Sequence, residues 1–472
     1  MWNSDDLMPD GPRYRALADR IAGDVAGGRL QPGEQLPPQR ELARALGLDV
    51  TTVTRGYREA ARRGLVHGEV GRGTFVSGPS IDAKPGGAEL AAPAKRDDGA
   101  LDLALNIPPR LTPDPMGAAL SRTLGALHGV RDLSGLLEYH YAAGHLAHRE
   151  AAAAWVGHSG IVPDPARIVV VSGAQHGLAS TISALARPGG ILLTEEVTYP
   201  GIRALAEQLA LRLVGVPVDE DGITPEGLRA ACAATGATLL CFTPTLQNPT
   251  SSIMPRRRRE QIAEVALEHR LTLIEDDVYG ALVEAPPPPF ASLLPESTYY
   301  ATSLSKTVSP GLRTGYVVAP SERGASRVAA SVLASTRMAA PLTCEIATSW
   351  IRDGTALRLL HMHREAARAR QKIAATLLAS RGWSAHPEGY HGWLKLESEW
   401  SGAELALHAR RAGVLLTPGA AFAVPTPGGL EHPERSVRIS VSAPRDLASL
   451  EQALSRLCSV LDAGPEEAHS VV

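Results

Sequence analysis

The feature that most constrains the fold of this chain is the alternation of short apolar runs with helical stretches after residue 100. Five runs have the length and the flanking residues of buried strands, namely RIVVVSG, GILLTEE, ATLLCFTP, RLTLIEDD and TGYVVAP. Helical stretches such as PRRRREQIAEVALEHR lie between them. This order predicts an α/β fold with a mostly parallel central sheet covered by helices, with functional residues just after the strands.

A change of composition divides the chain before this alternation begins. The segment SGPSIDAKPGGAELAAPAKRDDGA is rich in Ala, Gly and Pro and has no apolar period, which is typical of a linker. A chain of 472 residues is also too long for one ordinary core. We therefore expect a first domain over residues 11–77, a linker over residues 78–100 and a second domain over residues 101–462.

The first domain carries three helical patterns. Leu17, Ile21 and Val25 recur every four residues and predict a first helix with one apolar stripe. Pro37-Pro38 can open a second helix, and Asp49 can cap a third. Three short helices are therefore expected before residue 64.

A hairpin pattern follows these helices. LVHGEVGRGTFV predicts two short strands around a Gly-Arg-Gly turn. Residues 11–76 hold eleven Arg against seven Asp or Glu, a net charge of +4 in a chain whose total is −3. This order and this charge predict a winged helix-turn-helix that binds double-stranded DNA. The alternative is a set of helices whose charged faces are merely solvated.

In the second domain, polar motifs stand at the predicted strand ends. They are SGAQHG (172–177), TPTLQNPT (243–250), EDDVYG (275–280) and SLSKTVSPGLR (303–313). Each motif alone has an ordinary explanation as a turn, a helix cap or a surface pair. Together they supply a lysine for a Schiff base, a carboxylate for a pyridinium nitrogen, and Gly, Ser and Arg for a phosphate. A pyridoxal 5'-phosphate (PLP) site needs this set of groups.

The motifs resemble two known families. Residues 101–460 are similar to fold-type I PLP aminotransferases, in which Asn248, Asp276, Lys306 and Arg313 follow one another at steps of 28, 30 and 7 residues. The first domain resembles the GntR winged helix in three segments, GEQLPPQRELARALG, TTVTRGY and GRGTFV. The whole chain therefore resembles the MocR (GabR-like) subfamily of GntR transcription regulators.

The resemblance implies a role for each motif residue of the second domain. Lys306 would form the internal aldimine with PLP, and Asp276, with Asp277 as its rival, would pair with the pyridine nitrogen. Arg438 would grip the carboxylate of an effector, and Tyr139 would reach the phosphate of a neighbouring subunit. The other cofactor-binding residues would be Tyr279 and Asn248 at the phenolic oxygen, Tyr199 against the ring, and Ser303, Arg313, Ala174 and Gln175 at the phosphate.

In the first domain the resemblance implies a DNA interface, with some departures. The candidate DNA-binding residues are Arg40, Thr51, Thr52, Arg55 and Arg72. Val50-Thr51 stands where the family has Ser-Arg, and Pro38 where it has Ser. In the second domain Ser251 replaces the glycine of NPTG. We expect the run 256–259 of four arginines to be a solvated helix face rather than a second DNA patch.

These features predict a PLP-dependent transcription regulator that senses an amino acid or amine, and the family resemblance implies that it is a head-to-tail homodimer. The alternatives are an active PLP-dependent aminotransferase and a regulator that senses PLP itself. The four cysteines form no CxxC pair, which favours the reduced cytoplasm and predicts no metal site. The chain has no apolar run of 18 residues, so no membrane partner is expected.

Overall fold

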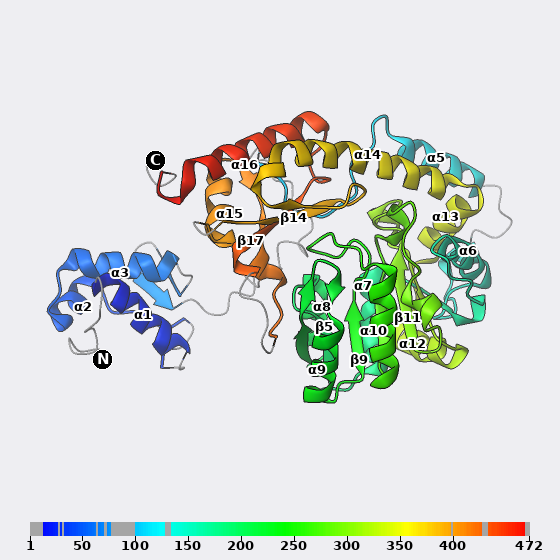
Figure 1. The fold of residues 1–472 in the computed structure, drawn as a ribbon, viewed down its shortest axis with the longest axis horizontal. Helices are drawn as coiled ribbons and strands as arrows, with labels where there is room; N and C mark the ends of the chain where they lie inside the picture. The colour runs from blue at the N-terminus through cyan, green and yellow to red at the C-terminus, as the bar shows by residue number, and fades with distance from the viewer. Residues whose placement is uncertain are drawn as a thin grey trace. The chain divides into compact units, whose positions relative to one another are not determined.

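The computed structural model describes residues 13–26, 29–30, 33–62, 65–69, 73–76, 100–127, 134–397, 400–426 and 433–467. The chain divides into two compact units, Met1–Gly87 and Ala88–Val472 (Figure 1). Residues 78–99 of the expected linker lie outside the described residues, and so does Arg72.

The first unit contains three helices followed by an antiparallel hairpin, as the sequence predicts. Its elements are α1 (Arg13–Ala26), α2 (Gln39–Leu46), α3 (Val50–Arg62), β1 (Val66–Glu69) and β2 (Gly73–Val76). Leu17 and Ile21 of α1 are fully buried against Val53 of α3 in one small core. The side chain of Val25 is outside those described.

Local chemistry explains where these helices begin and end. α2 starts after Pro38, and it ends at Gly47, whose φ of 60° is the left-handed conformation that glycine adopts at low cost. α3 starts after Asp49, whose carboxylate accepts a hydrogen bond from the Thr51 main-chain nitrogen at 2.7 Å. Tyr57 donates a hydrogen bond to the Pro37 oxygen at 2.8 Å, which fixes α3 against the start of α2.

A seven-stranded sheet forms the centre of the second unit (Figure 1). All five predicted strands belong to it, and two more, β6 (Arg212–Val216) and β11 (Thr298–Ser303), complete it. β12 (Gly315–Val318) runs antiparallel to both of its neighbours, whereas the other strands are parallel. In spatial order the strands are β4 (Ile168–Val171), β12 (Gly315–Val318), β11 (Thr298–Ser303), β10 (Thr272–Asp276), β9 (Leu239–Phe242), β5 (Ile191–Glu195) and β6 (Arg212–Val216).

Successive residues of a strand point to opposite faces of the sheet. Because these strands carry apolar residues on both faces, helices cover both faces of the sheet. Val169 and Val171 of β4 pack into a cluster with α7 (Ala174–Leu185), α8 (Pro200–Gln208) and α12 (Glu322–Ser335), whereas Val170 packs into the cluster on the other face. The helices of this unit are α5 (Pro115–Leu127), α6 (Leu146–Gly157), α7 (Ala174–Leu185), α8 (Pro200–Gln208), α9 (Pro225–Thr235), α10 (Arg256–Glu268), α11 (Phe290–Leu293), α12 (Glu322–Ser335), α13 (Pro341–Arg352), α14 (Thr355–Leu378), α15 (Gly402–Arg411) and α16 (Leu447–Glu467).

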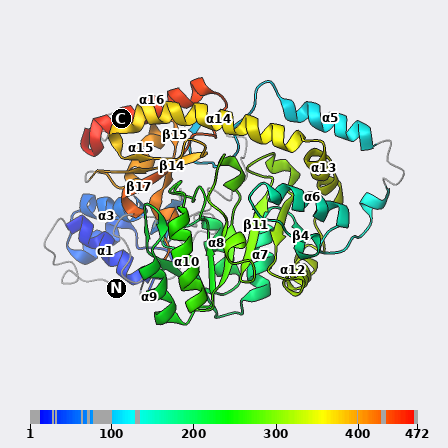
Figure 2. The same cartoon turned by 45° about the vertical axis from the view of Figure 1, so that its right-hand side comes forward.

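A smaller antiparallel sheet lies under α14 and α16, which run side by side in Figures 1 and 2. Its strands in order are β13 (Trp383–Ser384), β14 (His391–Lys395), β17 (Ser436–Ser440) and β16 (Thr417–Pro418). β3 (Leu101–Asp102), the first described strand after the expected linker, pairs in parallel with β15 (Val414–Leu415). β7 (Val218–Asp219) and β8 (Gly222–Ile223) form a separate hairpin. Among the described helices, none has the length and apolar character to span a membrane.

Candidate functional site

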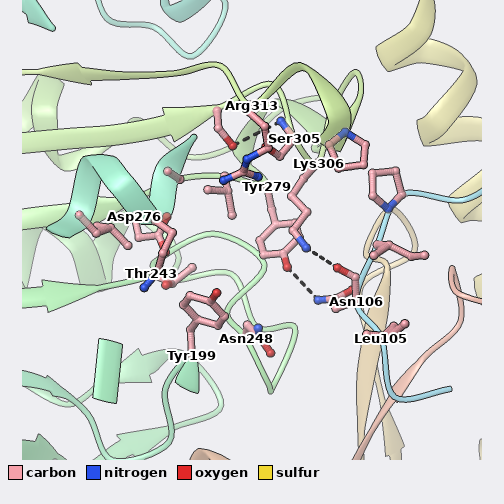
Figure 3. A pocket seen from close by; sticks show the side chains of 18 residues that line it. Leu105, Asn106, Tyr199, Thr243, Asn248, Asp276, Tyr279, Ser305, Lys306 and Arg313 are labelled. Atoms are coloured by element: carbon pink, nitrogen blue, oxygen red, sulfur yellow. Dashed lines mark hydrogen bonds between the residues drawn. The ribbon is translucent and has the colours of Figure 1, made fainter. Parts of the chain in front are cut away.

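A cavity of about 330 Å³ opens where the carboxyl ends of the central strands meet the segment after β3 (Figure 3). Lys306, whose amino group points into this cavity, lies three residues after the end of β11. Every residue predicted to bind the cofactor lines the cavity. They are Lys306, Asp276, Tyr279, Asn248, Ser303, Arg313, Ala174, Gln175 and Tyr199.

The two candidate carboxylates at the end of β10 have different surroundings. Asp276 is buried and lines the cavity, and its Oδ1 has no hydrogen-bond partner among the described residues. Burial, reinforced by the charges of Asp277 and Glu195, raises the pKa of Asp276 to about 8. Asp277 lies outside the lining of the cavity and accepts a hydrogen bond from the Tyr300 hydroxyl at 2.7 Å. Asp276 is therefore the carboxylate that can meet an N–H group in the cavity.

A cradle for an anion lies at the start of α7. Gly173 precedes this helix with a φ of 86°, and a Cβ there would lie 2.7 Å from Nη2 of Arg313. The Arg313 guanidinium also donates to the Ser172 oxygen at 3.1 Å. The Oγ atom of Ser305 is buried and has no hydrogen-bond partner within the described part of the chain. A helix N-terminus with an arginine and hydroxyl groups suits a phosphate.

The loop after β9 holds Asn248 in place. Ser251 adopts a φ of 62°, the left-handed conformation suited to the glycine it replaces, and its Oγ accepts from the His386 nitrogen at 3.2 Å. Arg259 donates from Nη2 to the Pro244 oxygen at 3.1 Å and to Thr245 Oγ1 at 2.7 Å.

The expectation that the arginines of 256–259 form a solvated face is wrong for Arg259. Its side chain is fully buried, and its Nη1 lies 3.6 Å from the Glu275 carboxylate. Arg258 pairs with Asp219 at 2.8 Å, whereas Arg256 and Arg257 are exposed. Arg259 is buried because acceptors on the Asn248 loop need a hydrogen-bond donor from α10. A run of four arginines does not show which of them meets such acceptors.

Arg438 lies beside the cavity rather than in its lining. It is fully buried in β17, donates from Nη1 to Asn248 Oδ1 at 3.1 Å, and donates from Nη2 to the Ala104 oxygen. Its guanidinium carbon is 5.0 Å from the centre of the Phe422 ring. Tyr139 is 76% exposed, and Arg337 stacks on its ring at 4.2 Å.

Two residues of the site, Asn106 and His391, lie in none of the motifs that predicted it. Asn106 accepts a hydrogen bond from Lys306 Nζ through its main-chain oxygen and donates from Nδ2 to the Tyr279 hydroxyl at 2.8 Å (Figure 3). The same Nδ2 lies 3.0 Å from Nδ1 of His391. Asn106 stands in the segment LDLALNIPP, outside any recognised motif, so no feature of the sequence distinguished it.

In the first unit, the candidate DNA-binding residues lie on and around α3. Arg40, Thr51 and Arg55 are exposed, and Thr52 is half-buried. The Arg55 guanidinium lies 4.4 Å from the centre of the Tyr14 ring. Thr54 donates to Gln39 Oε1 at 2.7 Å, which fixes α3 to the start of α2.

Comparison with known proteins agrees with this architecture. Residues 99–457 match the family "Aminotransferase class I and II", and residues 13–76 match "Bacterial regulatory proteins, gntR family". The chain is 30% identical to the HTH-type transcriptional regulator YdeF of Bacillus subtilis, with 98% of this chain and 97% of YdeF covered. It is 26% identical to the vitamin B6 salvage pathway transcriptional repressor PtsJ of Salmonella typhimurium, with 95% and 100% covered. An archaeal alanine:glyoxylate aminotransferase superposes with a TM-score of 0.70 at 23% identity, over 77% of this chain and 91% of that chain.

The fold and the site together define a winged helix-turn-helix unit joined to a fold-type I aminotransferase-like domain. The chain belongs to the HTH-type transcriptional regulators of the GntR family that carry such a domain, the MocR type. The aminotransferase family implies PLP as the cofactor. The cavity fits this group, because it offers a lysine, a buried carboxylate with an open oxygen, and an anion cradle.

Proposed function

We propose that this regulator holds PLP covalently at Lys306 and changes its DNA binding when an amino acid or amine enters the same cavity. The observation that carries this proposal is that nine residues predicted from separate motifs line one cavity. When bound, PLP supplies an electron-withdrawing ring and an aldehyde carbon that combines with primary amines.

Each predicted residue has a place in this proposal. Asp276 would hold the proton of the pyridine nitrogen, since its open oxygen and raised pKa suit that contact. Tyr279 and Asn248 would bind the phenolic oxygen, and Tyr199, half-buried at the start of α8, would stack on the ring. The phosphate would bind at the N-terminus of α7, with Ala174, Gln175, Ser303 and Arg313 around it.

The effector in this proposal is an amino acid. Lys306 would exchange with its amine, and Arg438, joined to the cofactor residue Asn248 by a hydrogen bond, would bind its carboxylate. A buried guanidinium is costly without an anion or several acceptors, so the carboxylate would replace contacts such as that to the Ala104 oxygen. An amine without a carboxylate should bind more weakly.

The proposal also covers the oligomeric state, the compartment, the DNA contacts and the bounds of the domains. We expect a cytoplasmic homodimer, with the head-to-tail arrangement that the family resemblance implies. Its DNA contacts would come from Arg40, Thr51, Thr52, Arg55 and Arg72. The first domain would span 11–77, the linker 78–100 and the second domain 101–462.

Two alternatives have specific support. The name of the relative PtsJ refers to vitamin B6 salvage, which favours PLP itself as a signal. An active aminotransferase is favoured by the presence of the lysine, the carboxylate and the arginine that transamination uses.

One set of experiments separates these functions. Binding of the protein to DNA from its own upstream region is measured without PLP, with PLP, and with PLP plus each of twenty amino acids. Release or tightening by an amino acid supports the proposal, and the same change with PLP alone supports the vitamin sensor. Transamination between an amino acid and a 2-oxo acid, without any change in DNA binding, supports the alternative of an active aminotransferase. Borohydride reduction followed by peptide mass mapping tests whether PLP attaches at Lys306.

A further inference from the structure

A buried chain of polar groups joins three segments that are distant in sequence at the edge of the cavity. Asn106 lies four residues beyond β3, Tyr279 follows β10, and His391 begins β14. Asn106 and His391 are 3% and 0% exposed, so their polar atoms bond within the protein or to a ligand.

The direction of each hydrogen bond follows from the chemistry of His391. Burial and the charge of Arg438 lower the pKa of His391 to about 3, so the ring is neutral and carries one N–H. Its Nε2 lies 3.0 Å from the Gln247 oxygen, which can only accept, and therefore Nε2 carries the hydrogen. Its Nδ1 must then accept from Asn106 Nδ2 at 3.0 Å.

This acceptor fixes the orientation of the Asn106 amide. One hydrogen of Nδ2 goes to His391 and the other to the Tyr279 hydroxyl at 2.8 Å. Because Tyr279 accepts from Asn106, the phenol proton is directed to a different acceptor. The Asn106 Oδ1 is buried with no hydrogen-bond partner in the part of the chain that the structure describes. Unsatisfied buried oxygens are rare except where a ligand enters.

Asn106 also contacts the reactive lysine. Its main-chain oxygen accepts from Lys306 Nζ, so one residue contacts both Lys306 and Tyr279 (Figure 3). The ammonium of Lys306 lies 5.7 Å from the centre of the Tyr279 ring. The three groups therefore form one unit in the lining of the cavity.

We propose that Asn106 is a positioning residue of the cofactor site, whose amide, held by His391, directs the Tyr279 hydroxyl proton toward the phenolic oxygen of PLP. This inference rests on the proposed function, because it places PLP at Lys306. It adds a residue pair that neither the motifs nor the family match assigns.

The test is a double-mutant cycle on the full-length protein with PLP as the probe. The variants are Asn106→Ala, Tyr279→Phe and the pair, and the readouts are the PLP dissociation constant and the position of the visible band of the bound cofactor. The loss of one hydrogen bond should raise the PLP dissociation constant about 3- to 10-fold in Asn106→Ala and in Tyr279→Phe. In the double variant the dissociation constant should be less than about 2-fold higher than in Tyr279→Phe alone, because Asn106 acts through Tyr279.

A second variant separates orientation from packing. Asn106→Asp keeps the size of the side chain but places an acceptor against the Tyr279 hydroxyl and His391 Nδ1. It should weaken PLP at least as much as Asn106→Ala and shift the visible band, whereas a packing role predicts that the isosteric variant is the milder one. Gln208→Glu, the same chemical change at an exposed position of α8, is the matched control and should behave as wild type.

The outcomes distinguish this inference from the proposed function. If PLP forms no visible band, or if borohydride traps it away from Lys306, the proposed function fails and the inference fails with it. If PLP attaches at Lys306 but Asn106→Ala has no effect, or its effect multiplies with that of Tyr279→Phe, the inference alone is wrong. Should Asn106→Ala show no cooperative unfolding transition, Asn106→Ser carries the same cycle.

Discussion

Arg438 on β17 and Asn248 after β9 share a hydrogen bond of 3.1 Å, although 190 positions separate them in the chain. Asn248 lies on the loop of the large sheet and Arg438 on the small sheet, so this contact links the predicted cofactor contact to the predicted effector contact. A ligand that draws the Arg438 guanidinium to its carboxylate would change the surroundings of Asn248. The two sheets are therefore joined at the point where an amino acid would bind.

Replacement of Arg438 tests this link. Arg438→Ala should still attach PLP and still bind DNA, but lose the change of absorbance that an amino acid causes. It should also lower the free energy of unfolding by about 1–3 kcal/mol, because buried acceptors such as the Ala104 oxygen lose a donor. Arg435→Ala, at an exposed position just before β17, is the control. An unchanged response in Arg438→Ala would contradict the amino-acid proposal.

The stability of the cofactor-free protein should depend on Asp276. Burial raises its pKa from 3.8 to about 8, so the folded state binds a proton more tightly than the unfolded chain does. Stability from this group is present below pH 4 and is lost as the pH rises through about 8. Glu275, whose pKa burial raises to about 7, acts in the same direction.

Thermal or urea unfolding at several pH values measures this effect. We expect the free energy of unfolding to fall by about 1 kcal/mol per pH unit for each such proton between pH 5 and 7. Asp276→Asn should flatten part of this slope and weaken PLP. Asp277→Asn should weaken PLP less, because Asp277 contacts Tyr300. A steeper slope in Asp276→Asn than in wild type would contradict the assigned cause.

The sequence predicted the parts of the site that lie in short, contiguous motifs. Asp276 ends β10 and Lys306 follows β11, and the carboxyl ends of neighbouring parallel strands lie close together. Arg313 precedes β12, which starts at the same edge because it runs antiparallel to β11. Asn106 and His391 could not be found in this way, because their roles depend on a contact between segments 285 positions apart. The burial of Arg259 was missed for a similar reason, since its acceptors on the Asn248 loop are assembled only in the fold.

The winged helix-turn-helix should bind DNA through exposed arginines of α2 and α3. Arg40→Ala and Arg55→Ala should each weaken binding by about 1–3 kcal/mol where the arginine reads a guanine with two bonds. Arg55 stacks on Tyr14 in the free protein, so part of its binding energy offsets the loss of that contact. Fluorescence anisotropy with the upstream DNA at several salt concentrations measures the change, with the exposed Arg13→Ala as control. Full affinity in the Arg40→Ala, Arg55→Ala double variant would place the interface elsewhere.

Arg259 should support PLP binding from outside the cavity. Arg259→Met fills much of the same space but removes the donors to Pro244 and Thr245, and it leaves the buried Glu275 carboxylate without a nearby guanidinium. Loss of one partner from a buried ion pair costs about 3–5 kcal/mol, so the unfolding free energy should fall by that order. PLP should also bind more weakly, because the loop that carries Asn248 loses its anchor on α10. Arg257→Met, two positions away and exposed, should change neither quantity in unfolding and absorbance titrations. Equal behaviour of the two variants would show that Arg259 does not hold the loop.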